Sequence, residues 1–360
     1  MMRVIQMVDG LDYGDAVSGD VLKIDGMLRE LGVESLIYSK YCDQRVEKYR
    51  NQINDYLPKK NDLVLYHFSG KSSIMDQALS GPPCIGRYHN ITPPEFFLQY
   101  NQHIFEITSE GLNQIKENIM RFDGFAADSE FNRNDLISYG AEPDSTDVLS
   151  ISVDLNTVLN KPYDKELLAE LKKGKPYILF VGRMAPNKKI EDILDVFENY
   201  YRYHDKSIKL YLVGNSEHTS SYTEHILEKL ETMEAKDNVI ITGKVSDEAL
   251  YAYYRGASAF LCMSEHEGFC VPLIEAQIFG IPVIGYNSCA VPDTMGKSGI
   301  LLYEKDPALT AWLLDKVINE KRIRSSVLER QKLNVKRFAP EKIKKQLSTL
   351  LKKWEGMYYG

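Results

Sequence analysis

Short runs of apolar and β-branched residues alternate along the chain with longer stretches in which apolar residues recur at helical spacing. This alternation is typical of parallel α/β units, in which each strand is followed by a helix. One such helix is predicted over Val21–Leu31 and ends at Gly32. The predicted strands are Val4–Val8, Leu36–Tyr38, Leu63–Tyr66, Cys84–Arg87 and Phe125–Ala127 in the first half, and Tyr177–Val181, Lys209–Val213, Val239–Thr242, Ala259–Met263 and Val283–Gly285 in the second.

The strand pattern stops once and starts again. The stretch between the two series, residues 155–175, is charged and punctuated by Pro and Gly, which is typical of a linker. A chain of 360 residues also has room for about two domains. We therefore predict two doubly wound α/β domains, residues 1–160 and 175–338, with hinge strands around Lys161–Pro176 and near Phe338–Pro340.

Composition narrows the function classes. The net charge is -7 and the isoelectric point near 5.6, which argues against a general nucleic-acid-binding protein, because tracking phosphates needs a basic face. The five cysteines form no Cys-x-x-Cys pair, which favours a reducing compartment over a disulfide framework. With no signal-like segment and no uncharged apolar run of about 18 residues, we expect a cytoplasmic protein.

The C-terminal stretch Glu341–Trp354 has an amphipathic pattern. Its apolar positions fall on one helical stripe and its lysines largely off it. A packed helix with a solvated basic face is the favoured interpretation. Attraction to an anionic surface is the alternative, so a peripheral contact with the inner face of a membrane stays open.

The residues that could bind a ligand are expected directly after the strands, because ligands of open parallel sheets bind outside the carboxyl ends of the strands. After Val181 comes Gly182-Arg183, and Lys188-Lys189 precede the next helical run. A guanidinium fork and an ammonium point charge are the two usual ways to hold phosphate oxygens. The alternative is that these are ordinary surface charges beside a Pro-Asn turn.

A second segment follows the strand predicted at Ala259–Met263. It places Glu267 in a loop before Gly268, and Glu275 in the opening turns of a helix that begins near Pro272. Both carboxylates could face one crevice with the free N–H groups of the helix start between them, and one carboxylate can accept from two sugar hydroxyls. Alternatively, Glu275 is only a favourable charge near a helix start.

The combination of these segments resembles the C-terminal domain of family 4 glycosyltransferases, which are retaining enzymes of the GT-B fold. The resemblance covers most of residues 176–305 and includes Gly280-Ile281-Pro282 after the second glutamate. In the first half, Arg87–Pro94 is similar to an acceptor-side loop of one subgroup, and Gly14–Ser18 lies where the family has a glycine-rich loop. The resemblance implies two Rossmann-like domains facing a central cleft, with the last helix (residues 339–360) crossing back to the first domain.

The resemblance also implies roles for individual residues. Arg183 and Lys188 would grip the donor diphosphate, Glu275 would hold the ribose hydroxyls, and Glu267 would lie by the donor sugar. The remaining implied donor contacts are the backbones of Gly268, Phe269 and Cys270, the base contact at Val245, the loop at Gly14, and His89 near the transferred sugar. Two departures stand out: Lys189 replaces a frequent glycine, and Tyr13-Gly14-Asp15 replaces a double glycine.

The implied reaction moves a hexose from a nucleotide-diphosphate sugar to a saccharide, lipid-linked or small-molecule acceptor. Two fixed cations would stabilise the charge that develops on the leaving diphosphate, so neither a divalent metal nor another cofactor is expected. The sequence agrees, since it has no Asp-x-Asp in a plausible loop and no His/Cys cluster. The subgroup resemblance points to the assembly of polysaccharides or other surface glycans. His67 and His266 are predicted to be structural.

Other functions stay open at this point. A nucleotide-sugar epimerase would need no acceptor, and a phosphorylase would need a pyridoxal-phosphate lysine, for which the sequence has no supporting context. A non-catalytic subunit that binds nucleotide sugars is also compatible, although the joint presence of both cations and both glutamates argues against it. A dinucleotide oxidoreductase is disfavoured, because no Gly-x-Gly-x-x-Gly follows the first strand or Val181.

Overall fold

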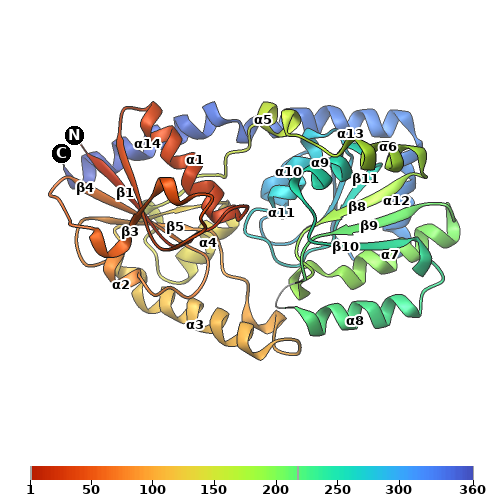
Figure 1. The fold of residues 1–360 in the computed structure, drawn as a ribbon, viewed down its shortest axis with the longest axis horizontal. Coiled ribbons are helices and arrows are strands. Elements are labelled where there is room, and N and C mark those ends of the chain that lie inside the picture. Colours follow the sequence, from red (N-terminus) through yellow and green to blue (C-terminus); the bar gives the residue numbers. More distant parts are fainter. Residues whose placement is uncertain (1, 217–218, 360) are drawn as a thin grey trace. The chain divides into compact units, whose positions relative to one another are not determined.

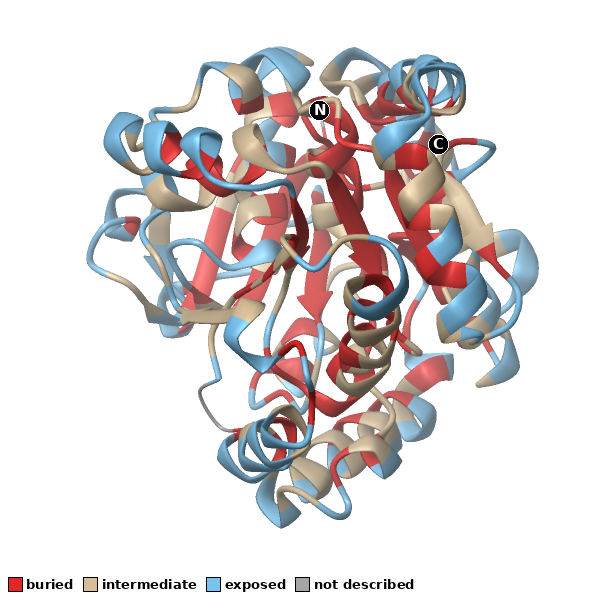
Figure 2. Ribbon diagram, turned by 90° about the vertical axis from the view of Figure 1, so that its right-hand side faces the viewer, coloured by how far each residue is buried: buried red, intermediate tan, exposed pale blue. Residues whose placement is uncertain are grey.

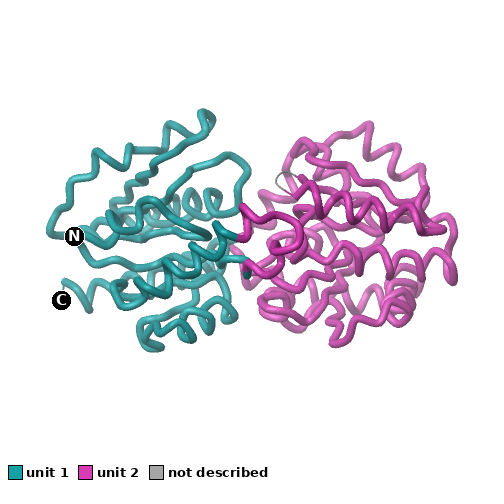
Figure 3. Tube along the Cα trace, turned by 90° about the horizontal axis from the view of Figure 1, so that it is seen from below, with its two compact units in different colours: residues 1–93, 106–152, 340–360 teal, residues 94–105, 153–339 magenta. Residues whose placement is uncertain are grey.

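The computed structural model describes residues 2–216 and 219–359. The chain forms two compact units, which Figure 3 shows in different colours. Unit 1 comprises residues 1–93, 106–152 and 340–360, and unit 2 comprises residues 94–105 and 153–339. Each unit has its own parallel sheet and its own buried clusters, as expected of a doubly wound α/β domain.

Unit 1 is built on a seven-stranded parallel sheet of order β3-β2-β1-β4-β5-β6-β7 (Figure 1). Its strands are β1 Arg3–Leu11, β2 Glu34–Cys42, β3 Arg50–Gln52, β4 Asp62–Phe68, β5 Cys84–Tyr88, β6 Gly124–Ala127 and β7 Thr146–Val148. The helices of this part of the chain are α1 Ala16–Glu30, α2 Met75–Ala78, α3 Gln102–Asn118, α4 Glu130–Ser138 and α14 Pro340–Tyr358.

Unit 2 is built on a six-stranded parallel sheet of order β10-β9-β8-β11-β12-β13. Its strands are β8 Tyr177–Val181, β9 Lys209–Val213, β10 Val239–Gly243, β11 Ala259–Cys262, β12 Val283–Tyr286 and β13 Ile300–Leu302. Its helices are α5 Leu155–Asn160, α6 Lys165–Lys173, α7 Ile190–Tyr203, α8 Ser220–Glu231, α9 Asp247–Gly256, α10 Val271–Ile278, α11 Val291–Met295, α12 Pro307–Asn319 and α13 Lys321–Asn334.

The predicted fold class is confirmed, and all ten predicted strands occur. Figure 2 shows why they were visible in the sequence: the strands are buried, while the surrounding helices are exposed on one side. The three strands that the pattern did not reveal, β3, β7 and β13, lie at sheet edges and have three residues each. So short a run carries almost no periodic signal, and an edge strand is covered by only one neighbour.

The structure corrects one predicted helix start and one predicted linker, and in both cases a side chain caps a helix that begins there. Helix α1 begins at Ala16, five residues before the predicted start, because the Asp15 carboxylate accepts a hydrogen bond from the Ser18 N–H at 2.9 Å. The stretch predicted as a linker contains α5 and α6, whose N-caps are Asp154 and Asp164. Both helices belong to unit 2, so the chain passes between the units at residues 152–153.

The C-terminal helix α14 belongs to unit 1, as the resemblance implied. Its apolar stripe, including Ile343, Leu347 and Trp354, is buried in one cluster with residues of β1, β4, β5 and α1. The lysines lie outside this cluster, and two of them are paired: Lys344 with Glu30 at 2.8 Å and Lys353 with Asp147 at 2.7 Å. The packed amphipathic helix is therefore confirmed. Among the described residues, no helix is apolar over a length that could cross a membrane.

Candidate functional site

The predicted donor segments lie at one topological feature of unit 2. The strand order reverses between β8 and β11, so the loops that follow these two neighbouring strands lead to helices on opposite faces of the sheet. Residues 182–189 follow β8, and residues 263–270 follow β11. The sheet topology therefore brings together two segments that are separated by about 80 residues in the sequence, at the place where open α/β sheets bind ligands.

The loop after β8 contains a 3-10 turn, η6 (Pro186–Lys188), as the Pro-Asn pair predicted. The next residue, Lys189, has a φ of +51°, in the left-handed region that favours glycine. Its ammonium lies 3.4 Å from Glu191 and 3.5 Å from Glu265. The residue that departs from the family pattern therefore keeps the glycine-like backbone and adds an ionic contact to the loop after β11.

Asn187 fastens the two loops to each other. Its backbone carbonyl accepts from the N–H of Glu265 at 2.9 Å, and its Nδ2 donates to the carbonyl of His266 at 3.0 Å. The side chain is buried, and its Oδ1 has no partner among the described residues. Asn187 thus sets the position of the residue beside it, Lys188, relative to the second loop.

Lys188 and Glu267 form the centre of the site. The Lys188 ammonium lies 2.7 Å from Glu267 Oε2, and Ser264 Oγ donates to Glu267 Oε1 at 2.8 Å. Burial has the largest single effect on the pKa of Lys188 and lowers it, but the opposing effects, led by the charge of Glu267, together raise the net pKa. Both side chains are largely buried, so the pair has little freedom to move.

Hydrogen-bond donors without partners lie next to this pair. The backbone N–H groups of Phe269 and Cys270 find no acceptor in the described part of the chain. Cys270 has a φ of +70° and directly precedes α10, so the chain turns sharply there into the helix. The carbonyl of Phe269 is held by the Thr294 hydroxyl. These free N–H groups beside a cation form a suitable place for phosphate or hydroxyl oxygens.

Arg183 supplies a further cation at the end of β8. Its side chain is exposed, and no carboxylate forms an ion pair with it among the described residues. The backbones of Gly182 and Gly214 lie close together here. A Cβ atom on residue 214 would be only 1.9 Å from the carbonyl oxygen of Gly182. Gly214 has a φ of +153° and follows β9, so a glycine at this position allows the ends of β8 and β9 to meet.

The second glutamate lies in α10, as predicted. Tyr254, at the end of α9, donates to Glu275 Oε2 at 3.0 Å. Burial, followed by the charge of Glu275, raises the pKa of the Tyr254 phenol well above its usual value, so Tyr254 remains a donor. Val245 lies in the turn between β10 and the N-cap of α9, Ser246, and is partly exposed.

His266 was predicted to be structural and is buried in the loop after β11. Its Nδ1 lies 3.5 Å from the Sγ of Cys289, and its ring faces Phe96 at 6.2 Å between centroids. Burial lowers the pKa of His266 to about 4, with Lys188 adding to the effect and Glu267 opposing it. Its ring is therefore neutral around pH 7.

In unit 1, the proposed sugar-side histidine is part of a buried polar chain. His89 Nδ1 lies 3.0 Å from Asp128 Oδ2, and His89 Nε2 lies 3.0 Å from His67 Nδ1. His67 Nε2 contacts the side-chain oxygen of Gln6 at 3.0 Å. The Gln6 oxygen can only accept, so His67 Nδ1 is the bare nitrogen, and every contact is satisfied when both nitrogens of His89 donate.

Arg87 balances the charges of this chain. Its guanidinium is fully buried and lies 2.9 Å from Asp20 and 2.7 Å from Asp128. It also donates to the carbonyl of Leu149 at 2.5 Å. The other unit 1 residue of the prediction, Gly14, has a φ of +82° and lies in the loop before α1 with open space around it.

Among the described residues, two groups of side chains have the composition of a metal site. Asp20, His67 and His89 form one, and Cys262, Glu267 and Cys270 form the other, each with ligand atoms within 4.8 Å of one another. No local pattern in the sequence indicated the second group, because its cysteines are eight positions apart. In both, a protein cation already pairs with a carboxylate: Arg87 with Asp20 and Lys188 with Glu267.

Several site residues were missed at the level of sequence. Asn187 was interpreted only as part of a turn, and Ser264, Tyr254 and Thr294 were not assigned a role. Each acts by holding a predicted residue or its loop in place. No local pattern identifies such contacts, because they depend on which loops the sheet brings together.

Comparison with known proteins agrees with this geometry. Residues 165–338 match the family described as Glycosyl transferases group 1. The chain is 28% identical over 195 residues to the O-antigen chain mannosyltransferase B of Escherichia coli, covering 52% of this chain and 49% of that protein. It is 24% identical over 351 residues to the capsular polysaccharide biosynthesis glycosyltransferase CapM of Staphylococcus aureus, covering 87% and 89%.

The fold has a counterpart among solved structures. Anabaena HepE in complex with UDP and glucose has a TM-score of 0.74 with 15% identity, covering 98% of this chain and all of that one. The α/β architecture with two Rossmann-like parallel sheets is thus the GT-B fold. The match to the Escherichia coli mannosyltransferase spans less than half of that protein.

Proposed function

We propose that the protein is a retaining, metal-independent glycosyltransferase of the type that family 4 represents. It would move a hexose from a nucleotide-diphosphate sugar to a hydroxyl of a glycan, a lipid-linked saccharide or a small-molecule acceptor. The observation that carries the proposal is the Lys188–Glu267 pair at the β8–β11 switch point, with unpartnered N–H groups of Phe269 and Cys270 beside it. A cation and free backbone donors at a switch point suit a diphosphate.

The donor contacts that we propose are those that the family resemblance implies. Arg183 and Lys188 bind the diphosphate together with the N–H groups of Phe269 and Cys270. Glu275, held by Tyr254, accepts from the ribose hydroxyls. Glu267 lies by the hexose, and Gly268, Val245 and Gly14 contribute backbone contacts to the sugar, the base and the phosphates.

In the reaction that we propose, the bond between the anomeric carbon and the β-phosphate oxygen breaks before the acceptor oxygen attacks. The acceptor oxygen bonds to the anomeric carbon from the same face, and its proton passes to a β-phosphate oxygen of the leaving nucleoside diphosphate. Arg183 and Lys188 stabilise the charge that grows on that phosphate, and this interaction is stronger in the transition state than in the bound substrate.

His89 enters the proposal in a different way from the one the resemblance implied. Both of its ring nitrogens have partners within unit 1. A hydrogen bond from either nitrogen to a sugar hydroxyl would displace His67 or Asp128. We therefore propose that His89 contributes a fixed surface at the carboxyl end of β5, without binding a hydroxyl through a ring nitrogen.

The relatives support a role in the synthesis of polysaccharides. The Escherichia coli protein is an O-antigen chain mannosyltransferase, and the Staphylococcus aureus protein is a glycosyltransferase of capsular polysaccharide biosynthesis. The complex of HepE with UDP and glucose makes a UDP-sugar the first donor to test. A nucleotide-sugar epimerase and a non-catalytic binding subunit are the alternatives, and the experiments below separate them from a transferase.

The first experiment measures thermal unfolding with a panel of UDP-, GDP- and ADP-sugars. A ligand at a hundred times its Kd should stabilise the protein by about 2.7 kcal/mol. Arg183→Ala should abolish this stabilisation. Lys206→Ala is the matched control, because Lys206 is an exposed cation of the same unit that pairs with Glu234. No response to any nucleotide sugar would contradict the proposal.

The second experiment follows chemistry with the donor that binds. Incubation with candidate acceptors in the presence of a chelator should release the nucleoside diphosphate, and NMR of the product should show the anomeric configuration of the donor. Conversion of the donor without an acceptor would indicate an epimerase. Binding without turnover on any acceptor would favour the non-catalytic subunit, and a requirement for a divalent metal would contradict the proposed role of the two cations.

A further inference from the structure

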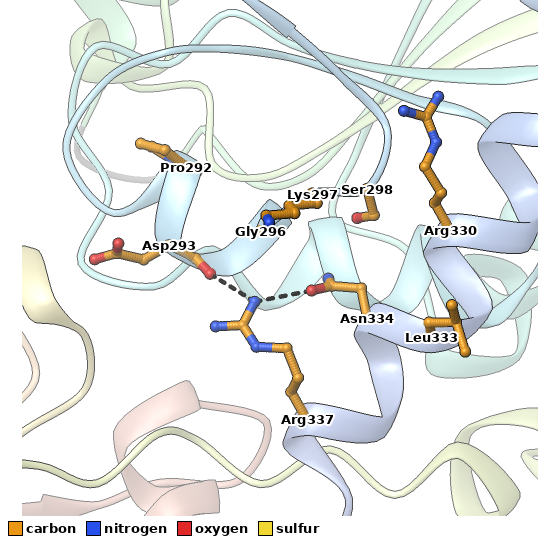
Figure 4. A pocket seen from close by; sticks show the side chains of 9 residues that line it. All are labelled: Pro292, Asp293, Gly296, Lys297, Ser298, Arg330, Leu333, Asn334 and Arg337. Atoms are coloured by element: carbon orange, nitrogen blue, oxygen red, sulfur yellow. Dashed lines mark hydrogen bonds between the residues drawn. The ribbon is translucent and has the colours of Figure 1, made fainter.

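Unit 2 has a pocket of about 650 Å³ at the C-terminal end of α13, in addition to the proposed donor site. It lies between α11 with the turn after it and the helical turn η8 (Val335–Phe338) that continues α13, as Figure 4 shows. The side chains that concern the argument are Asp293, Lys297, Arg330, Leu333, Asn334 and Arg337. None of them belongs to the two loops that form the proposed donor site.

Three of these residues are cations without an ionic partner. Among the residues that the structure describes, no carboxylate forms an ion pair with Lys297, Arg330 or Arg337. Other lysines of unit 2 do have such partners; Lys305, for example, lies 2.5 Å from Glu265. The one carboxylate in the lining, Asp293, points away from Arg330 in Figure 4. The pocket therefore gathers positive charge that the protein itself leaves unneutralised.

Arg337 is held in place by two hydrogen bonds. One of its terminal nitrogens donates to the carbonyl of Asp293 at 3.1 Å and to Asn334 Oδ1 at 2.9 Å. A Cβ at Gly296 would lie 2.5 Å from this same nitrogen, and the φ of Gly296 is +55°. Glycine is thus needed where the guanidinium approaches the backbone. The other guanidinium nitrogens remain available to donate to an anion.

The wider surroundings favour an anion as well. Residues 321–339, which belong to the same unit, contain seven Lys and Arg but only one Glu and no Asp, in a chain whose net charge is -7. An anion is therefore attracted to this part of the protein. Leu333, also in the lining, is 66% exposed and adds an apolar wall. The combination fits a phosphate group attached to an organic residue.

We propose that this pocket binds the phosphate group of an organic phosphate, with Lys297 and Arg337 as its donors and Arg330, whose guanidinium points to the other side in Figure 4, as a further cation of the lining. Two sources supply this chemistry: a soluble phosphate ester and the headgroup of an anionic phospholipid. The site is separate from the loops after β8 and β11, and the proposal does not depend on the glycosyltransferase activity. It assigns a ligand to charges that the donor site does not use.

The test uses the full chain and two probes. Glycerol 3-phosphate is titrated by calorimetry, and vesicles of phosphatidylglycerol and phosphatidylcholine in equal parts are tested by co-flotation. The variant Lys297→Ala/Arg330→Ala removes two of the three cations of the lining and leaves Arg337 and Asn334 in place. Its control is Lys321→Ala/Lys332→Ala, which removes the same charge from exposed positions of α13 outside the pocket.

We expect saturable binding of at least one probe by the wild type and by the control. The pocket variant should bind about tenfold more weakly or worse, because each lost charge-assisted hydrogen bond is worth more than 1 kcal/mol. Binding of glycerol 3-phosphate identifies a soluble ester as the source, and binding of vesicles alone identifies a lipid headgroup; both support the pocket.

Three results would overturn the proposal. These are no binding of either probe, an equal loss in the pocket variant and the control, and displacement of the bound probe by UDP. The last result would place the phosphate in the donor site. Arg183→Ala separates the two proposals, since it should weaken UDP and leave the pocket unchanged. Failure of UDP binding with intact phosphate binding would count against the glycosyltransferase alone.

Discussion

The two units place polar residues at the carboxyl ends of their strands, but they use them differently. In unit 1, Arg87, His89 and Asp128 have all their partners within the unit, and all three side chains are almost completely buried. In unit 2, Arg183 is exposed and without an ionic partner, and the N–H groups of Phe269 and Cys270 have no acceptor among the described residues.

This difference separates a structural polar network from a binding site. A buried network in which every group has a partner is rigid, and loss of one member leaves the others unpaired in a medium of low polarity. A site with spare donors can exchange water for a ligand. Residues of the same types at the same end of a parallel sheet thus have opposite functions, and substitutions should separate them.

The largest effect is expected for Arg87→Met in unit 1. It leaves the buried carboxylates of Asp20 and Asp128 without their shared cation, so the free energy of unfolding should fall by about 3–5 kcal/mol. Urea unfolding followed by circular dichroism measures the loss. Arg202→Met, which removes a half-exposed guanidinium from α7, should change it by less than about 1 kcal/mol. A similar result for both variants would show that the network is not critical for stability.

Arg183→Ala in unit 2 should have the opposite profile. We expect kcat/KM for transfer to fall about a hundredfold, equivalent to about 3 kcal/mol of transition-state stabilisation. The melting temperature of the ligand-free protein should not change, because Arg183 is exposed and has no ionic partner in the described structure. Loss of stability together with activity would make Arg183 part of a network like that of unit 1.

A pH dependence distinguishes His266 in unit 2. Its pKa is lowered to about 4 in the folded protein, mainly by burial, from an ordinary value of 6.5. Between these values the unfolded chain binds more protons than the folded one, so stability decreases as the pH falls from about 6.5 to about 4.

The variant His266→Gln should remove about 3 kcal/mol of this acid sensitivity, which urea unfolding at a series of pH values measures. The comparison is made with the wild type at pH 7, where the ring is neutral in both states and the pH-dependent contribution is absent. An unchanged slope between pH 6.5 and 4 in the variant would assign the acid sensitivity to other groups.

The smallest effect is expected for Tyr254→Phe. It removes one hydrogen bond to Glu275 and retains the packing of the ring, so UDP affinity should fall by about fivefold, corresponding to about 1 kcal/mol. Calorimetry measures the affinity. Tyr253→Phe on the same helix is the control. If Glu275→Gln also left UDP affinity unchanged, the proposed contact with the ribose would be contradicted.

The sequence by itself determined the parts of the structure that have a local cause. Strands such as β8 and β11 are continuous apolar runs because both faces of a parallel sheet are covered, and the helix over residues 341–354 has its stripe because one side is buried. The candidate residues Lys188, Glu267 and Glu275 were found from loops that follow strands and from a resemblance to a family.

Only the tertiary structure decided how those residues are held. The order of the strands brings the loops after β8 and β11 together, and Asn187, Ser264 and Tyr254 then fix the predicted side chains across distances of up to about 80 residues in the sequence. It likewise decided that His89 is enclosed by His67 and Asp128. Periodicity and capping act over a few neighbouring residues, whereas these contacts depend on which strands lie side by side, and no local pattern encodes that order.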